Sequence, residues 1–156
     1  MTGTSSPRAR FSWPFVRAAV VGAVLVVVLT APTVTHLTSV GRLDTSDGRL
    51  SIWNVAWVAH ALTTDPAHLF DTNMFWPHRG TLAYSELNLI AGVLAVPWFV
   101  VTGSPVAALN GAIATGLWLS FVLMWALVRR LTASDGAGLV AATGFTFSPF
   151  VTLAAR

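Results

Sequence analysis

Cysteine and lysine are both absent from the 156 residues, and charged residues make up only 10% of the chain. The lack of cysteine excludes disulfides, thiolate metal sites and a cysteine nucleophile. A soluble domain usually carries about 25% charged residues, so this chain lacks the polar surface that a water-soluble globule needs. The net charge of +3 comes from nine arginines spread along the sequence, not from a dense basic patch. Composition therefore argues against a soluble enzyme and against a nucleic-acid-binding protein.

Hydrophobic residues make up 54% of the chain, and they gather in long uncharged runs. The run 18–38 follows Arg17 and is long enough to cross a bilayer, which takes about 20 residues of helix. Three arginines lie before this run, so the positive-inside rule predicts that residues 1–17 are cytoplasmic. A cleaved signal peptide is the alternative. Against it, no small-x-small cleavage motif follows the apolar core, and apolar character continues past it.

A second uncharged stretch, 87–128, is too long for one span and is interrupted at 102–105. Pro105 suits the first turn of a new helix. The piece before the break, 87–101, would rise about 22 Å as a helix, which is short of a hydrocarbon core of about 30 Å. The piece 106–128 is long enough to span. A third apolar run covers 137–155.

The arginine pair at 129–130 decides the predicted topology. If 87–101 also crossed, the pair would face outside, against the positive-inside rule. A four-crossing arrangement stays an alternative, because two arginines are a small sample. We therefore predict an all-α integral membrane protein with about three transmembrane helices and with interfacial helices in a large first extracytoplasmic loop. The predicted segments are a cytoplasmic N-terminus at 1–17, transmembrane helices at 18–38, 106–128 and 137–155, the loop at 39–105 and a cytoplasmic turn at 129–136.

The predicted loop is rich in polar and aromatic residues, and we expect it to be structured. Residues 41–86 hold five of the six acidic residues and three of the four histidines. Ser51 can cap a helix that runs through Leu62, with Trp53 and Trp57 on one face together with His60 or Ala61. Asp65-Pro66 marks another helix start. Tryptophans are typical of the membrane–water interface.

Two aspartates of this loop, Asp44 and Asp47, are candidates for chemistry because they lie shortly after the first apolar run. A carboxylate near a membrane surface can deprotonate a hydroxyl or bind a divalent cation. The alternative is an ordinary solvated turn. Four further residues are candidate substrate contacts, although no tight metal-ligand spacing such as H-E-x-x-H is present. They are His60, Asp71, His78 and Glu86.

Small and amide residues in the apolar runs predict helix packing rather than ligand binding. Asn88 and Asn110 are expected to hydrogen-bond to another helix. No nucleotide-binding glycine loop and no G-x-S-x-G elbow occurs in the sequence. Five glycines are expected to allow close helix packing. They are Gly111, Gly116, Gly136, Gly138 and Gly144.

The order of these features resembles the N-terminal part of bacterial GT-C superfamily membrane glycosyltransferases, which use polyprenyl-phosphate-linked sugars. The likeness covers nearly the whole chain, but its motifs are short. Four stretches carry it: SDGRLSIWNVAWVAHAL at 46–62, DTNMFWPHRGTLAYSE at 71–86, RRLT at 129–132 and FSPF at 147–150.

The resemblance implies that an acidic residue of the first extracytoplasmic loop lies at the active site. Asp47 matches best by position, Asp44 is its neighbour, and Glu86 or Asp71 would be a second acid. Family members have many more spans, so we expect a fragment of a multi-pass plasma-membrane enzyme, inactive by itself. Its partners would be the lipid bilayer and the sugar donor, and a divalent cation is a possible cofactor. The alternative function is a non-enzymatic multi-pass membrane scaffold or subunit. A transporter ranks third, because the charges lie almost entirely outside the apolar runs.

Overall fold

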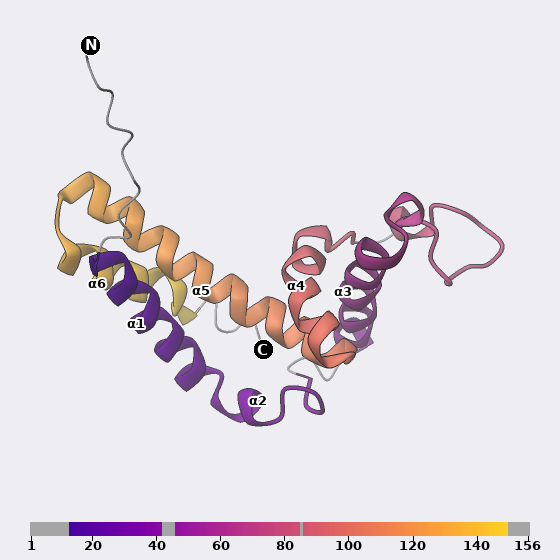
Figure 1. Cartoon of the computed structure of the whole chain (residues 1–156), viewed down its shortest axis with the longest axis horizontal. Helices are drawn as coiled ribbons and strands as arrows, with labels where there is room; N and C mark the ends of the chain where they lie inside the picture. Colours follow the sequence, from indigo (N-terminus) through magenta and orange to yellow (C-terminus); the bar gives the residue numbers. More distant parts are fainter. Residues whose placement is uncertain (1–12, 42–45, 85, 150–156) are drawn as a thin grey trace, which may run out of the picture.

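The computed structural model describes residues 13–41, 46–84 and 86–149, and within these ranges the regular structure is helical and without strands (Figure 1). The predicted all-helical class is therefore confirmed. In chain order the helices are α1 (Trp13–Leu29), α2 (Ala31–Thr35), α3 (Ser46–Thr64), α4 (Leu89–Thr102), α5 (Pro105–Thr132) and α6 (Asp135–Thr146), with short 3-10 turns η1 (Pro66–His68) and η2 (Thr81–Tyr84) between α3 and α4.

The central element is α5, which contacts each of α1, α3, α4 and α6. The Ser104 side chain caps its start by accepting a hydrogen bond from the Ala107 N–H at 3.3 Å, and Pro105 occupies the first turn as predicted. It ends where Ala133 adopts a left-handed conformation with φ 54°. Among the described residues, α5 is the one helix that is both long and apolar enough to cross a membrane. It contains the whole predicted span 106–128.

The first predicted span, 18–38, is not one continuous helix. Helix α1 ends at Leu29, and the short α2 begins two residues later. Pro32 has no N–H to donate to the carbonyl of Val28, so the hydrogen-bond ladder of α1 cannot continue through it. The third predicted span, 137–155, overlaps α6, which ends at Thr146. Its last residues lie outside the part of the chain that the structure describes.

Helices α1 and α6 run alongside the second half of α5 (Figure 1). Their shared core contains Ala18, Phe121, Trp125 and Ala142. Helix α1 approaches closely because Gly22 has no side chain; a Cβ there would lie 2.6 Å from Phe121 Cδ1. These contacts form one end of the molecule.

Helices α3 and α4 instead lie across the first half of α5 (Figure 1). Their core is built from small residues, among them Ala59, Ala95 and Ala108. Added Cβ atoms at Gly92 and Gly111 would lie 2.2 Å from atoms of Val58 and Trp98, respectively. The side chains of Val58 and Trp98 therefore fill the space that a larger residue would need at these two glycines.

The expected glycine packing holds for only part of the set. Gly111 meets Trp98 and Gly138 meets Trp125, whereas a Cβ at Gly116 or Gly144 would meet nothing within 4 Å. Gly136 would meet only the Ser134 Oγ, at 4.0 Å. Close helix approach therefore depends on two of the five predicted positions.

The two predicted asparagines behave differently. The Asn110 amide donates to the carbonyls of Leu37 and Val40, at 3.0 and 2.9 Å, and ties α5 to the segment after α2 rather than to a helix. Asn88 precedes α4 in a left-handed conformation, and its side chain makes no capping bond.

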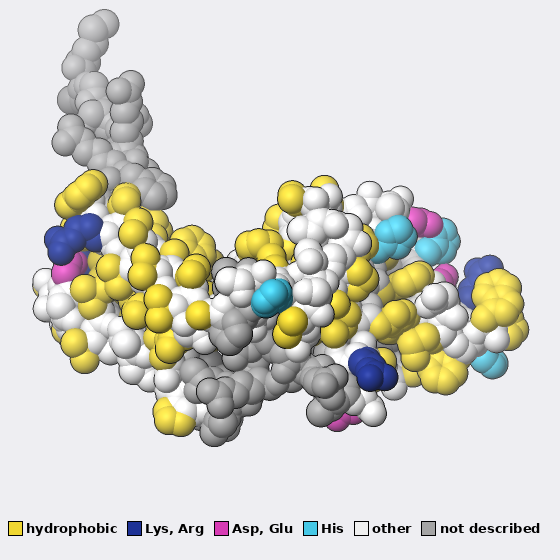
Figure 2. Space-filling model, turned by 90° about the horizontal axis from the view of Figure 1, so that it is seen from below, with side chains coloured by type: hydrophobic (Ala, Val, Ile, Leu, Met, Phe, Trp, Pro, Cys, Tyr) yellow, Lys and Arg dark blue, Asp and Glu magenta, His cyan; other side chains and the backbone are white. Residues whose placement is uncertain are grey.

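Figure 2 shows dark-blue and magenta side chains at one end and over the opposite half of the molecule. Arg129, Arg130 and Asp135 lie where α5 is followed by α6, and α3 and its following loop carry most of the other described charges. Between Ala112, which packs against the α3–α4 layer, and Arg129, helix α5 rises about 26 Å without a charge. Large apolar side chains such as Val24, Leu123 and Val140 are exposed in this band. This part of α5 is therefore an uncharged band that ends at Arg129.

Candidate functional site on α3 and its loop

The candidate site begins at the N-terminus of α3, which starts at Ser46 and not at the predicted Ser51. Asp47 lies in its first turn and is exposed. A carboxylate there is favoured by the helix dipole, which explains why the helix extends back through this segment. The other candidate, Asp44, lies outside the described residues.

Helical spacing places Asp47 on the same side of α3 as Ser51 and Asn54, four and seven residues further on. This side faces the loop that follows α3. A groove of about 220 Å³ lies between the two, and Leu50 and Asn54 line it from the helix. The loop contributes Met74, Phe75 and Tyr84, among other residues. Asp47 therefore lies one turn before the start of a groove with aromatic walls.

Asn54 was not identified as a site residue from the sequence. It is only 2% exposed, and its amide donates a hydrogen bond to the backbone carbonyl of Glu86. Its Oδ1 has no hydrogen-bond partner among the described residues. The sequence does contain a feature that could have identified it, because Asn54 is a single amide between the apolar residues Trp53 and Val55 of a helix.

A second groove, of about 300 Å³, lies on the adjoining side of α3, and Trp53 lines both grooves. Trp53 and Trp57 stack there with ring centroids 6.1 Å apart, and His60 continues the row toward Phe99 of α4. The predicted shared face of the two tryptophans and His60 is therefore confirmed. The Trp57 indole N–H donates to the carbonyl of Leu69 at 2.9 Å, which fixes this ring.

The loop after α3 is closed by its own hydrogen bonds. The Asp71 carboxylate accepts from the Gly80 N–H at 2.8 Å, and the hydroxyls of Thr72 and Thr81 are 2.6 Å apart. Asp71 therefore uses one carboxylate oxygen to hold the loop. His78 lies in the exposed turn that this loop encloses.

The structure does not gather the predicted site residues into one cluster. His60 lies about 20 Å along α3 from Asp47 and borders the other groove. The Glu86 side chain is exposed and lies in the loop before α4, which begins at Leu89. In the described ranges, no group of three or more His, Asp or Glu side chains is arranged to hold a metal ion.

No family model, curated protein or solved structure matches this chain.

Proposed function

We propose that this chain is the N-terminal part of a membrane glycosyltransferase that moves a sugar from a polyprenyl-phosphate donor to an extracytoplasmic acceptor. The observation that carries the proposal is the exposed carboxylate of Asp47, in the first turn of α3 beside a groove. An uncharged band separates this end from Arg129 and Arg130. That arrangement suits an acid held at one membrane surface, with arginines at the other.

The membrane placement follows from the length of the band. Its rise of about 26 Å along α5 approaches the thickness of a hydrocarbon core, about 30 Å. Arg129 and Arg130 then belong on the cytoplasmic side. The α3–α4 layer lies across the first half of α5 (Figure 1). With the arginines on the cytoplasmic side, this layer would lie at the outer interface. The proposal keeps α4 at that interface and has about three crossings.

In the proposed reaction, Asp47 accepts the proton of an acceptor hydroxyl. The oxygen of that hydroxyl then forms a bond to the anomeric carbon of the sugar. The bond from this carbon to the phosphate oxygen breaks, and polyprenyl phosphate leaves with the electron pair. Attack opposite the leaving group inverts the anomeric configuration. Trp53 lines the groove beside Asp47, and its ring offers a surface on which a sugar can lie.

Replacing Asp47 with Asn tests the proposal. Base catalysis contributes about 10²–10⁴-fold, so we expect Asp47→Asn to lose at least a hundredfold in rate, while the exposed side chain leaves folding intact. The assay measures polyprenyl phosphate released from a panel of polyprenyl-phosphate-linked hexoses, in membranes that contain the protein expressed from its complete reading frame.

Asp65→Asn is the matched control, because Asp65 at the other end of α3 is also exposed and its carboxylate pairs, among the described residues, with the exposed His68. Retained activity in Asp47→Asn, or an equal loss in both variants, would remove Asp47 from the mechanism.

The alternative, a membrane scaffold or subunit, is supported by the exposed aromatic side chains of the loop. Phe75, Trp76 and Tyr84 are 62%, 83% and 66% exposed. A partner protein or lipid headgroups would cover them. Full activity of a Trp76→Ser variant, together with loss in Asp47→Asn, would favour the enzyme over the scaffold.

A further inference from the structure

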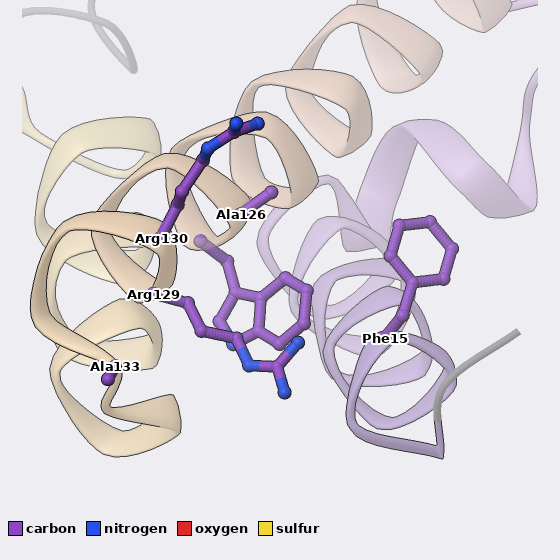
Figure 3. A pocket seen from close by; sticks show the side chains of 6 residues that line it. Phe15, Ala126, Arg129, Arg130 and Ala133 are labelled. Carbon is purple, nitrogen blue, oxygen red and sulfur yellow. The ribbon is translucent and has the colours of Figure 1, made fainter.

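A pocket of about 460 Å³ lies at the end of the molecule opposite the α3 site (Figure 3). Phe15 of α1 borders it on one side. Trp125, Ala126, Arg129 and Arg130 of α5 border it on the other, with Ala133 at its edge. The pocket therefore combines aromatic rings and guanidinium groups where the uncharged band ends.

Arg129 is held in place on two sides. Its Nε–H pairs with the carboxylate of Asp135, and its guanidinium lies over the Trp125 ring, 5.2 Å from the centroid. Its two terminal amino groups keep further N–H donors. The ion pair and the ring contact thus orient this arginine in advance of any ligand.

Arg130 supplies the uncompensated charge. It is exposed, and it forms no ion pair with the described residues. Figure 3 shows its side chain extending from α5 away from that of Arg129. Since Asp135 offsets only one of the two arginines, the pocket carries a net positive charge.

We propose that this pocket binds the phosphate of an anionic phospholipid of the cytoplasmic leaflet. Phosphate oxygens match the guanidinium donors. Apolar contact for the glycerol and upper acyl chains comes from Phe15, because Trp125 is only 2% exposed and acts through the arginine stacked on it. A soluble anion would make no use of this apolar contact. The proposal rests on the membrane placement proposed above, but not on glycosyl transfer.

Native mass spectrometry of the detergent-solubilised full chain tests this, by titration with phosphatidylglycerol or with phosphatidylcholine of the same acyl chains. One basic residue near a membrane surface contributes about fivefold to binding of an anionic lipid. We expect one saturable phosphatidylglycerol site, preferred about fivefold over phosphatidylcholine, and loss of this preference in Arg130→Gln. Arg130→Lys should retain most of it.

Arg17→Gln is the matched control, because it removes the same charge from an exposed position of α1 that does not line the pocket. Its preference should stay as in the unmodified chain. Equal losses in Arg17→Gln and Arg130→Gln would reduce the effect to general surface charge and overturn the site. Displacement of the lipid by excess inorganic phosphate would overturn the lipid as its ligand. Because the readout is lipid retention, neither failure depends on glycosyltransferase activity.

Discussion

Asn54 ties α3 to the start of α4 through a single buried amide. Its Nδ2 donates to the carbonyl of Glu86, which lies three residues before α4 begins at Leu89. The bond fixes one wall of the groove beside Asp47. The position of the segment around Glu86 relative to α3 therefore depends on the Asn54 side chain.

Replacing Asn54 with Ala should lower the free energy of unfolding by about 1–3 kcal/mol, because the Glu86 carbonyl loses its donor and a small cavity remains. Thermal unfolding in detergent, followed by circular dichroism, measures the change. Asn73→Ala is the control, since Asn73 is an exposed loop residue. Equal unfolding temperatures for the two variants would mean that the amide bond contributes nothing to stability.

The aromatic helix after Asp47 was predictable, because helical spacing of aromatic residues is a local pattern that the sequence shows directly. Its start was not, since Asp47 lies in the first turn of α3 rather than before the helix. The groove needs residues 72–84 to fold back onto α3, and this depends on the Asp71–Gly80 and Thr72–Thr81 contacts. Contacts between residues nine apart in a loop leave no periodic signal.

At the scale of elements, glycine decides how closely the helices pack. Gly92 of α4 lies against Val58 of α3, where an added Cβ would lie 2.2 Å from the valine Cγ1. A Cβ added at Gly116 of α5 would meet no atom within 4 Å. The two glycines lie in the described helices, yet only the first is required by packing.

We therefore expect opposite effects from one substitution at these two positions. Gly92→Ala should destabilise the protein by about 1–3 kcal/mol, because α3 and α4 must move apart. Gly116→Ala should stabilise it by about 0.5–1 kcal/mol, because alanine is the better helix former. The same thermal unfolding measurement compares them. Destabilisation by Gly116→Ala would contradict the open space around that position.

Element boundaries were predictable where the chain carries local start and stop signals. Ser104 and Pro105 mark the start of α5, and the helix begins there. The first apolar run predicted a transmembrane helix that is too long. Its apolar residues continue past Leu29, whereas the backbone hydrogen bonds of α1 end there. Hydrophobicity reports where a segment can be buried, whereas proline and capping report where its helix ends.

At the scale of the whole molecule, the number of crossings is the main prediction. Single cysteines at Asn73, Thr102 and Ala133 are clean probes, because the chain has none of its own. With about three crossings, an impermeant maleimide applied to intact cells should label positions 73 and 102, and position 133 only after permeabilisation.

Four crossings would give a different labelling pattern. Labelling at 73 and 133 but not at 102 would mean that α4 also crosses. It would place Arg129 and Arg130 outside, which contradicts both the proposed topology and the lipid pocket.

The packing of α1 against α5 joins two segments that the ribosome makes at different times. Ala18, Gly22 and Val26 form the buried side of α1, and the Trp118 indole N–H donates to the carbonyl of Ala19 at 2.9 Å, across 99 residues of chain. At about 5–20 residues per second, the ribosome needs about 5–20 s to make that interval. Helix α1 is therefore synthesised several seconds before the part of α5 against which it packs. A ribosome that stalls before Trp118 leaves a nascent chain in which α1 has no helix to pack against.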